Sequence, residues 1–144
     1  MLSEILEKMS KNYNDSLFYA KPDETGQSII IPDAEKEIIL EMCLKFLLNK
    51  GFEKLIYNQI IDNGVYFKVE KMVAVANYFE IGIFQEKENV KITMKFYDQI
   101  FQKPRQDSVM YLNLVKSIYR RLKRNMPESV IDQLSKYPRF FRKF

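Results

Sequence analysis

The chain has 144 residues, of which 47% are hydrophobic and 14% aromatic, and its formal net charge is +4. This length and apolar content suit one domain with a single core, and they exclude an intrinsically disordered chain. Only four glycines and five prolines are present, which favours long helices over many strands joined by tight turns. We expect no signal peptide, and no apolar stretch approaches the roughly 18 residues of a transmembrane segment.

The first element expected is an amphipathic helix. Residues Leu2 to Phe18 carry apolar side chains at helical spacing. The stretch from Ala20 to Ser28 is typical of a loop, because proline, aspartate and glycine gather there. Ile29 to Ile31 then form a β-branched run that Pro32 stops. This run predicts either a short strand or a buried apolar plug.

A helix is expected after Pro32. Asp33 is the predicted N-cap, an apolar stripe follows, and Gly51 is the predicted left-handed stop. A second, shorter helix is expected over Phe52 to Asp62, which would make the pair a helical hairpin. The predicted core residues of the first of these helices are Met42, Phe46 and Leu47.

The next stretch fits two periods. Apolar and polar residues alternate near 65–70 and near 90–97, as they do in half-buried strands. The same apolar residues also fit helical spacing. We favour helices at Lys68 to Ile81 and Val90 to Phe101, with Val65 to Phe67 extended.

The most strongly patterned stretch is the expected helix from Asp107 to Met126, which Pro127 breaks. One side of this helix is basic and the other is apolar. A short final helix is expected from Ser129 to Tyr137, followed by the tail RFFRKF. The apolar side comprises Tyr111, Leu114, Val115, Ile118, Tyr119, Leu122 and Met126.

Together these elements predict a mostly α protein, a single-domain bundle of about five to seven helices. The domain spans residues 1–144, and residues 103–144 are its basic carboxyl-terminal helical segment and tail. A short strand or a small β-hairpin is compatible with this prediction. The alternative is an α+β fold with strands near 65–70 and 90–97.

Charge is distributed unevenly along the chain. Residues 1–102 contain 12 basic and 16 acidic residues, whereas residues 103–144 contain 11 basic and 3 acidic residues. All six arginines lie in the last 40 residues, and arginine binds phosphate or carboxylate in a more fixed geometry than lysine does. Between Lys116 and Arg124 there are five cations and no acidic residue. This face lacks opposite-charge pairs, so an anionic partner is predicted, although a solvated face without a partner is the plain alternative.

The residues that most enzymes and metal sites need are scarce. The chain has one cysteine, Cys43, and no histidine, which excludes an internal disulfide and catalysis of the Ser-His or Cys-His kind. No phosphate-binding loop, metal-ligand spacing or nucleophile motif is present. We therefore predict a protein that is not an enzyme and that needs no cofactor or metal. Catalysis by carboxylate, lysine or tyrosine groups assembled on folding is the residual alternative.

The predicted function is that of a small intracellular binding protein, cytoplasmic or nuclear. It is expected to be a nucleic-acid-associated accessory or regulatory factor that binds DNA or RNA through its basic amphipathic helix. The rival is a protein-protein interaction adaptor, a homodimer or one bound to an acidic protein partner, that does not bind nucleic acid. The predicted contacts to the anionic partner are Lys116, Arg120, Arg121, Lys123, Arg124, Arg139, Arg142 and Lys143. The predicted aromatic contacts are Tyr119, Tyr137, Phe140 and Phe141.

Overall fold

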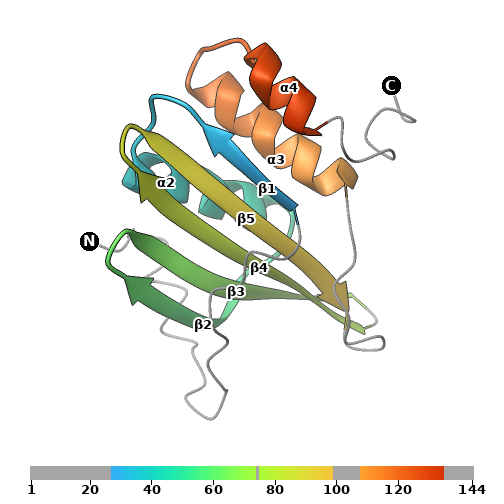
Figure 1. The fold of residues 1–144 in the computed structure, drawn as a ribbon. Helices are drawn as coiled ribbons and strands as arrows, with labels where there is room; N and C mark the ends of the chain where they lie inside the picture. Colours follow the sequence, from blue (N-terminus) through green and yellow to red (C-terminus); the bar gives the residue numbers. More distant parts are fainter. Residues whose placement is uncertain (1–26, 74, 99–107, 135–144) are drawn as a thin grey trace.

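A computed structural model of the protein describes residues 27–73, 75–98 and 108–134, which form a five-stranded antiparallel sheet and three helices (Figure 1). The elements in chain order are β1 (Gln27–Ile31), α2 (Lys36–Asn49), β2 (Lys54–Ile61), β3 (Gly64–Val73), β4 (Val75–Glu86), β5 (Asn89–Asp98), α3 (Ser108–Arg121) and α4 (Glu128–Leu134). The expected helix from Leu2 to Phe18 and the loop after it, up to residue 26, lie outside the described residues.

The prediction of a mostly α bundle is wrong, because the described residues form an α+β fold. The strand order is β1-β5-β4-β3-β2, and every neighbouring pair is antiparallel. The helix expected at Lys68 to Ile81 is occupied by parts of β3 and β4, and the one expected from Val90 is strand β5 as far as Asp98. The α+β alternative placed strands near 65–70 and 90–97, and β3 and β5 cover both stretches.

Side-chain alternation in the three central strands explains this outcome. Over residues 65–69, 79–83 and 90–94, every second residue is apolar and buried on one face of the sheet, which is the period of a strand. The turn between β4 and β5 is made by Lys87 and Glu88, with Lys87 at a φ of 58°, so a tight hairpin forms here without glycine. The buried residues on this face are Val65, Phe67 and Val69 of β3, Phe79, Ile81 and Ile83 of β4, and Val90, Ile92 and Met94 of β5.

Strand β2 replaces the predicted helix over Phe52 to Asp62. Its pairing with β3 has a register shift between Leu55 and Tyr57, as a β-bulge produces. The bulge interrupts the two-residue alternation, so the apolar residues of β2 imitate helical spacing. Gly64 is the first residue of β3, and a Cβ at this position would lie 2.0 Å from the backbone oxygen of Ile83.

Helix α2 confirms the prediction of a helix in this region but begins later than expected. Asp33 is not its N-cap: it has a φ of 50°, and Glu35 occupies the cap position without a side-chain hydrogen bond. The amide oxygen of Gln85 in β4 accepts a hydrogen bond from the Lys36 N–H at 2.9 Å, so the sheet satisfies one donor of the first turn. At the other end Gly51 adopts a φ of 93°, which confirms the predicted left-handed stop.

The three described helices contribute to one core with the apolar face of the sheet, and α2 lies behind the sheet in Figure 1. Phe46 and Leu47 are buried in this core, whereas Met42 is only partly buried against it. Cys43 is fully buried, and the loss of solvation raises the pKa of its thiol to about 12. None of the described helices is long and apolar enough to cross a lipid bilayer.

Candidate functional site

Helix α3 carries the predicted basic surface and ends earlier than expected. Lys123 has a φ of 56°, its N–H donates to the Arg120 carbonyl, and the Arg124 N–H donates to the Tyr119 carbonyl. These two bonds form a Schellman stop, which closes the helix after Arg121 rather than at the predicted Met126. The predicted cations Lys123 and Arg124 therefore lie beyond the end of the helix.

The predicted apolar side of this helix packs into the core. Tyr111, Leu114, Val115 and Ile118 are fully buried, and the Tyr111 hydroxyl donates to the Ile92 carbonyl at 3.3 Å. Leu122 and Met126, which also belong to this side, are partly buried against the same core. This packing determines the orientation of the polar side of α3.

The predicted cations fall into two groups. Arg120, Arg121 and Lys123 are exposed, whereas Lys116 and Arg124 are half-buried. Among the described residues neither Arg120, Arg121 nor Lys123 pairs with a carboxylate. We call these three residues the α3 cationic end. Two of them lie in the last turn of α3, where the helix dipole also favours positive charge.

Arg124 turns inward. Its Nη1 donates to the Pro32 carbonyl at 3.0 Å, and its guanidinium carbon lies 5.7 Å from the centre of the Tyr119 ring. The Nη2 atom is buried without a hydrogen-bond partner among the described residues. Arg124 thus links the segment after α3 to the end of β1, and little of its charge faces outward.

The predicted aromatic contact Tyr119 is a core residue, since only 3% of it is exposed. Burial raises the pKa of its phenol, although the nearby Arg124 charge acts in the opposite direction. The other predicted contacts lie outside the described residues. They are Arg139, Arg142, Lys143, Tyr137, Phe140 and Phe141.

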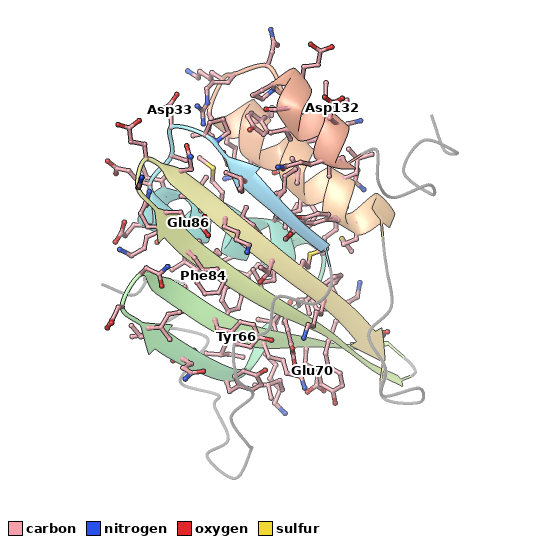
Figure 2. All side chains as sticks on the ribbon, in the orientation of Figure 1. Asp33, Tyr66, Glu70, Phe84, Glu86 and Asp132 are labelled. Carbon is pink, nitrogen blue, oxygen red and sulfur yellow. The ribbon has the colours of Figure 1, made fainter. Side chains whose placement is uncertain are left out.

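An open groove of about 560 Å³ lies beside the end of α3, and Leu122 forms part of its wall. The rest of the lining includes three acidic residues, one lysine and the exposed Ile38, and Figure 2 labels Asp33, which is one of the three acidic residues. The α3 cationic end therefore borders a surface with negative charge and apolar area. The residues lining the groove are Asp33, Ala34, Glu35, Ile38, Ile39, Gln85, Lys87, Glu88 and Leu122.

The sheet face opposite the helix core holds a polar cluster that the sequence analysis missed. Glu80 of β4 accepts hydrogen bonds from the Tyr57 hydroxyl at 3.0 Å and the Tyr66 hydroxyl at 2.5 Å. The Lys68 ammonium lies 3.8 Å from the same carboxylate and 4.6 Å from the centre of the Tyr78 ring. We call these five residues the tyrosine-glutamate cluster. Figure 2 labels Tyr66 on this face, together with Glu70 and Phe84.

Burial dominates the electrostatics of this cluster, since Lys68 is 6% exposed and Glu80 is 8% exposed. Loss of solvation lowers the pKa of Lys68, while the Glu80 and Glu70 charges act in the opposite direction. Burial likewise raises the pKa of Tyr78, with the Glu70 charge acting in the same sense. The carboxylate is held by two phenols and one amine, so the cluster can keep a charge buried at moderate cost.

An interpretation of residues 64–70 and 77–80 as two paired strands, with side chains alternating between faces, would have predicted this cluster. In that reading Tyr66, Lys68, Tyr78 and Glu80 share one face of a hairpin. Within the described ranges no group of three or more Cys, Asp or Glu side chains is arranged to hold a metal ion. The chain matches no protein-family model, no curated protein and no solved structure.

Proposed function

We propose that the protein binds nucleic acid as an accessory or regulatory factor, and that the α3 cationic end makes contacts to phosphates. The observation that supports this proposal is the exposure of Arg120, Arg121 and Lys123 without carboxylate partners among the described residues. Exposed guanidinium groups match the geometry of phosphate oxygens and keep their charge at all physiological pH values.

The proposed contact set is narrower than the one predicted from the sequence. Arg124 donates to the Pro32 carbonyl, and Tyr119 is buried, so neither is assigned a contact to nucleic acid. Lys116 is half-buried and is assigned a supporting electrostatic role only. The net charge of +8 in residues 103–144 adds a long-range attraction for polyanions.

The test is the salt dependence of binding to mixed-sequence DNA and RNA. Each phosphate contact that is lost should reduce the slope of log affinity against log salt by about 0.7 to 0.9. The combined variant Arg120→Gln, Arg121→Gln, Lys123→Asn should therefore flatten the slope by about 2 to 3 units. Asparagine is chosen at position 123 because it tolerates the left-handed backbone found there.

The matched control removes three exposed cations elsewhere. Lys45→Gln, Lys50→Gln and Lys54→Gln change the net charge equally but lie on α2, its end and β2. A specific contact predicts that this control keeps most of the salt slope. Equal loss in both variants would instead mean that only net charge matters, and absence of binding at low salt would refute the proposal.

A protein-protein adaptor is the second candidate, and the groove beside Leu122 is the observation that favours it. Its acidic rim and the exposed Ile38 suit a basic peptide with apolar side chains better than they suit a polyanion. The variant Ile38→Asp should then abolish partner capture without changing nucleic-acid affinity. If Ile38→Asp lowers nucleic-acid affinity and leaves partner capture unchanged, the adaptor proposal is wrong.

A further inference from the structure

The two edges of the sheet differ in how they are covered. At the β1 edge, the backbone N–H of Ile30 donates to the Gln133 side chain of α4 at 3.3 Å. At the opposite edge, no described element pairs with the outer side of β2. An open edge presents backbone donors and acceptors that can pair with another strand.

Strand β2 is protected in its first half only. Lys54 and the bulge between Leu55 and Tyr57 disfavour pairing there, because charge and bulges are the usual protection of edge strands. From Tyr57 to Ile61 the strand is regular and contains no charged residue, proline or glycine. Ile60 in this half is 65% exposed, which is the highest value among the large apolar side chains that the structure describes.

The geometry of the β2-β3 hairpin determines which backbone groups point outward. Ile61 pairs with Gly64 across a two-residue turn, and such flanking residues exchange backbone hydrogen bonds. Asn58 and Ile60 alternate with the bonded residues Tyr57, Gln59 and Ile61. Their N–H and C=O groups therefore face away from β3 and toward the open edge.

From this arrangement we infer that β2 pairs with β2 of a second copy of the chain in antiparallel orientation. The two-fold axis passes beside Gln59, the central residue of the regular half, so Asn58 of each copy lies opposite Ile60 of the other. Antiparallel pairing also brings the Lys54 end of each strand near Asp62 of the other copy. A parallel pair would place like charges together, so the charges favour the antiparallel arrangement.

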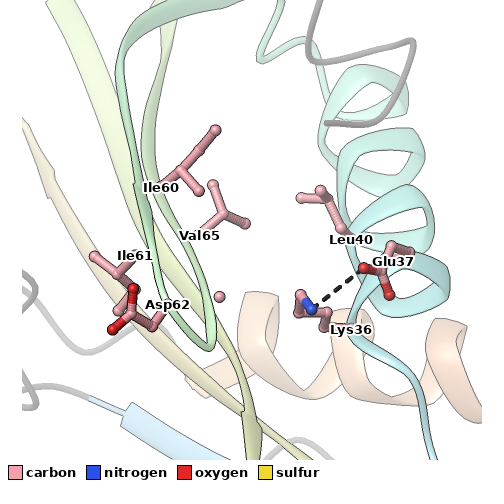
Figure 3. A pocket seen from close by; sticks show the side chains of 8 residues that line it. Lys36, Glu37, Leu40, Ile60, Ile61, Asp62 and Val65 are labelled. Atoms are coloured by element: carbon pink, nitrogen blue, oxygen red, sulfur yellow. Dashed lines mark ion pairs between the residues drawn. The ribbon is translucent and has the colours of Figure 1, made fainter. Parts of the chain in front are cut away.

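A pocket of about 220 Å³ extends the apolar surface beyond the edge, between α2 and the β2-β3 hairpin (Figure 3). Ile60 and Val65 point from the hairpin toward α2, where Leu40 faces them. Lys36 and Glu37 form an ion pair of 3.3 Å at the helix side of the pocket. A second copy at this edge would cover the exposed Ile60 as well as the open backbone groups. This dimer is independent of the proposed nucleic-acid contacts, which lie at the carboxyl end of α3.

The first experiment measures the mass of the full chain in solution by sedimentation over a wide concentration range. The wild type should form a dimer, and Ile60→Lys should raise the dimer dissociation constant by at least about tenfold, because it places two lysines at the shared edge. The matched control is Ile131→Lys, which adds the same charge at an exposed isoleucine of α4. A wild type that stays monomeric, or a dimer that Ile60→Lys leaves intact, would overturn the inference.

The second experiment tests the position of the axis. Residues opposite their own copy across an antiparallel pair have Cα atoms close enough for a disulfide. Gln59→Cys should therefore give a covalent dimer under mild oxidation, whereas Lys54→Cys should not, because its two copies lie roughly 30 Å apart in this register. Cys43 is fully buried and does not compete. Equal cross-linking of both variants, or of neither, contradicts the pairing.

Discussion

Both faces of the central sheet contain buried side chains, yet these side chains differ in their chemistry. On the helix-covered face, the buried side chains of β3, β4 and β5 are all apolar. On the other face, Glu80 and Lys68 are buried with three tyrosines around them. The apolar face tolerates changes of shape at a gradual cost, whereas the polar face depends on each charge keeping its partner. Substitutions on the two faces should therefore destabilise the protein by different mechanisms.

The largest effect is expected from Glu80→Gln. This change leaves the Lys68 charge buried without its counter-charge, and removal of one partner of a buried pair typically costs about 3 to 5 kcal/mol. Urea unfolding measures the loss of stability. Glu70→Gln is the matched control, since Glu70 is only half-buried on the same face. The double variant Lys68→Met, Glu80→Leu should recover much of the lost stability. If Glu80→Gln does not destabilise the protein, the proposed difference between the two faces is wrong.

On the helix side, Leu47→Ala should cost about 2 to 5 kcal/mol, as truncation of a buried leucine does. Leu47 of α2 is fully buried, so its truncation leaves a cavity in the core and no unpaired charge. Leu47→Met should cost less than about 1.5 kcal/mol because it preserves volume. A loss near that of an exposed site, below about half a kcal/mol, would show that α2 does not pack as described.

A smaller, pH-dependent effect is expected from Lys68. Burial lowers the pKa of its amine in the folded protein below the value of about 10.4 in the unfolded chain. Between these two pKa values the unfolded chain binds more protons, so the Lys68 contribution to stability rises as pH increases through this window. Lys68→Met should abolish that rise. The comparison belongs in a Tyr78→Phe background, because the raised pKa of Tyr78 acts oppositely above about pH 10.

The smallest effect is expected from Tyr119→Phe. The Tyr119 hydroxyl is buried without a hydrogen-bond partner among the described residues, so its removal should be neutral or stabilising by up to about 1 kcal/mol. Because the pKa of Tyr119 is raised on folding, the wild type should also lose stability above about pH 10 more steeply than the variant. Thermal unfolding at pH 7 and pH 11 measures both. A large loss at pH 7 would mean that the hydroxyl has a partner.

The sequence allowed prediction of features that depend on local pattern. Helix α2 and its Gly51 stop follow from a continuous apolar stripe ended by glycine. The buried side of α3 follows from the same logic. The helices predicted in place of β2, β3, β4 and β5 were wrong because a low glycine content does not exclude tight turns. Here Lys87 makes a tight turn, and the bulge at Leu55 hides the strand period.

Part of the candidate site was predictable because it depends on the local sequence pattern of α3. The exposure of Arg120 follows from its place opposite the apolar side of α3, whereas Arg121 lies at the border of that side. The inward turn of Arg124 depends on the left-handed Lys123 and on a carbonyl that lies 92 residues away in sequence. The tyrosine-glutamate cluster depends on strand pairing between β2, β3 and β4. No single segment contains the information for such long-range contacts.

The pairing of β1 with β5 has a consequence for the order in which the protein folds. Ile31 pairs with Val90, about sixty residues later in the chain, whereas β2 to β5 pair successively as hairpins. Contacts between residues so distant in sequence slow folding, because a large loop must close before they contribute. During synthesis on the ribosome, the hairpins can form as they emerge, but β1 must wait for β5. Until then Ile29 and Ile31 have no sheet to join, so β1 gains from chaperone protection while β5 is still being made.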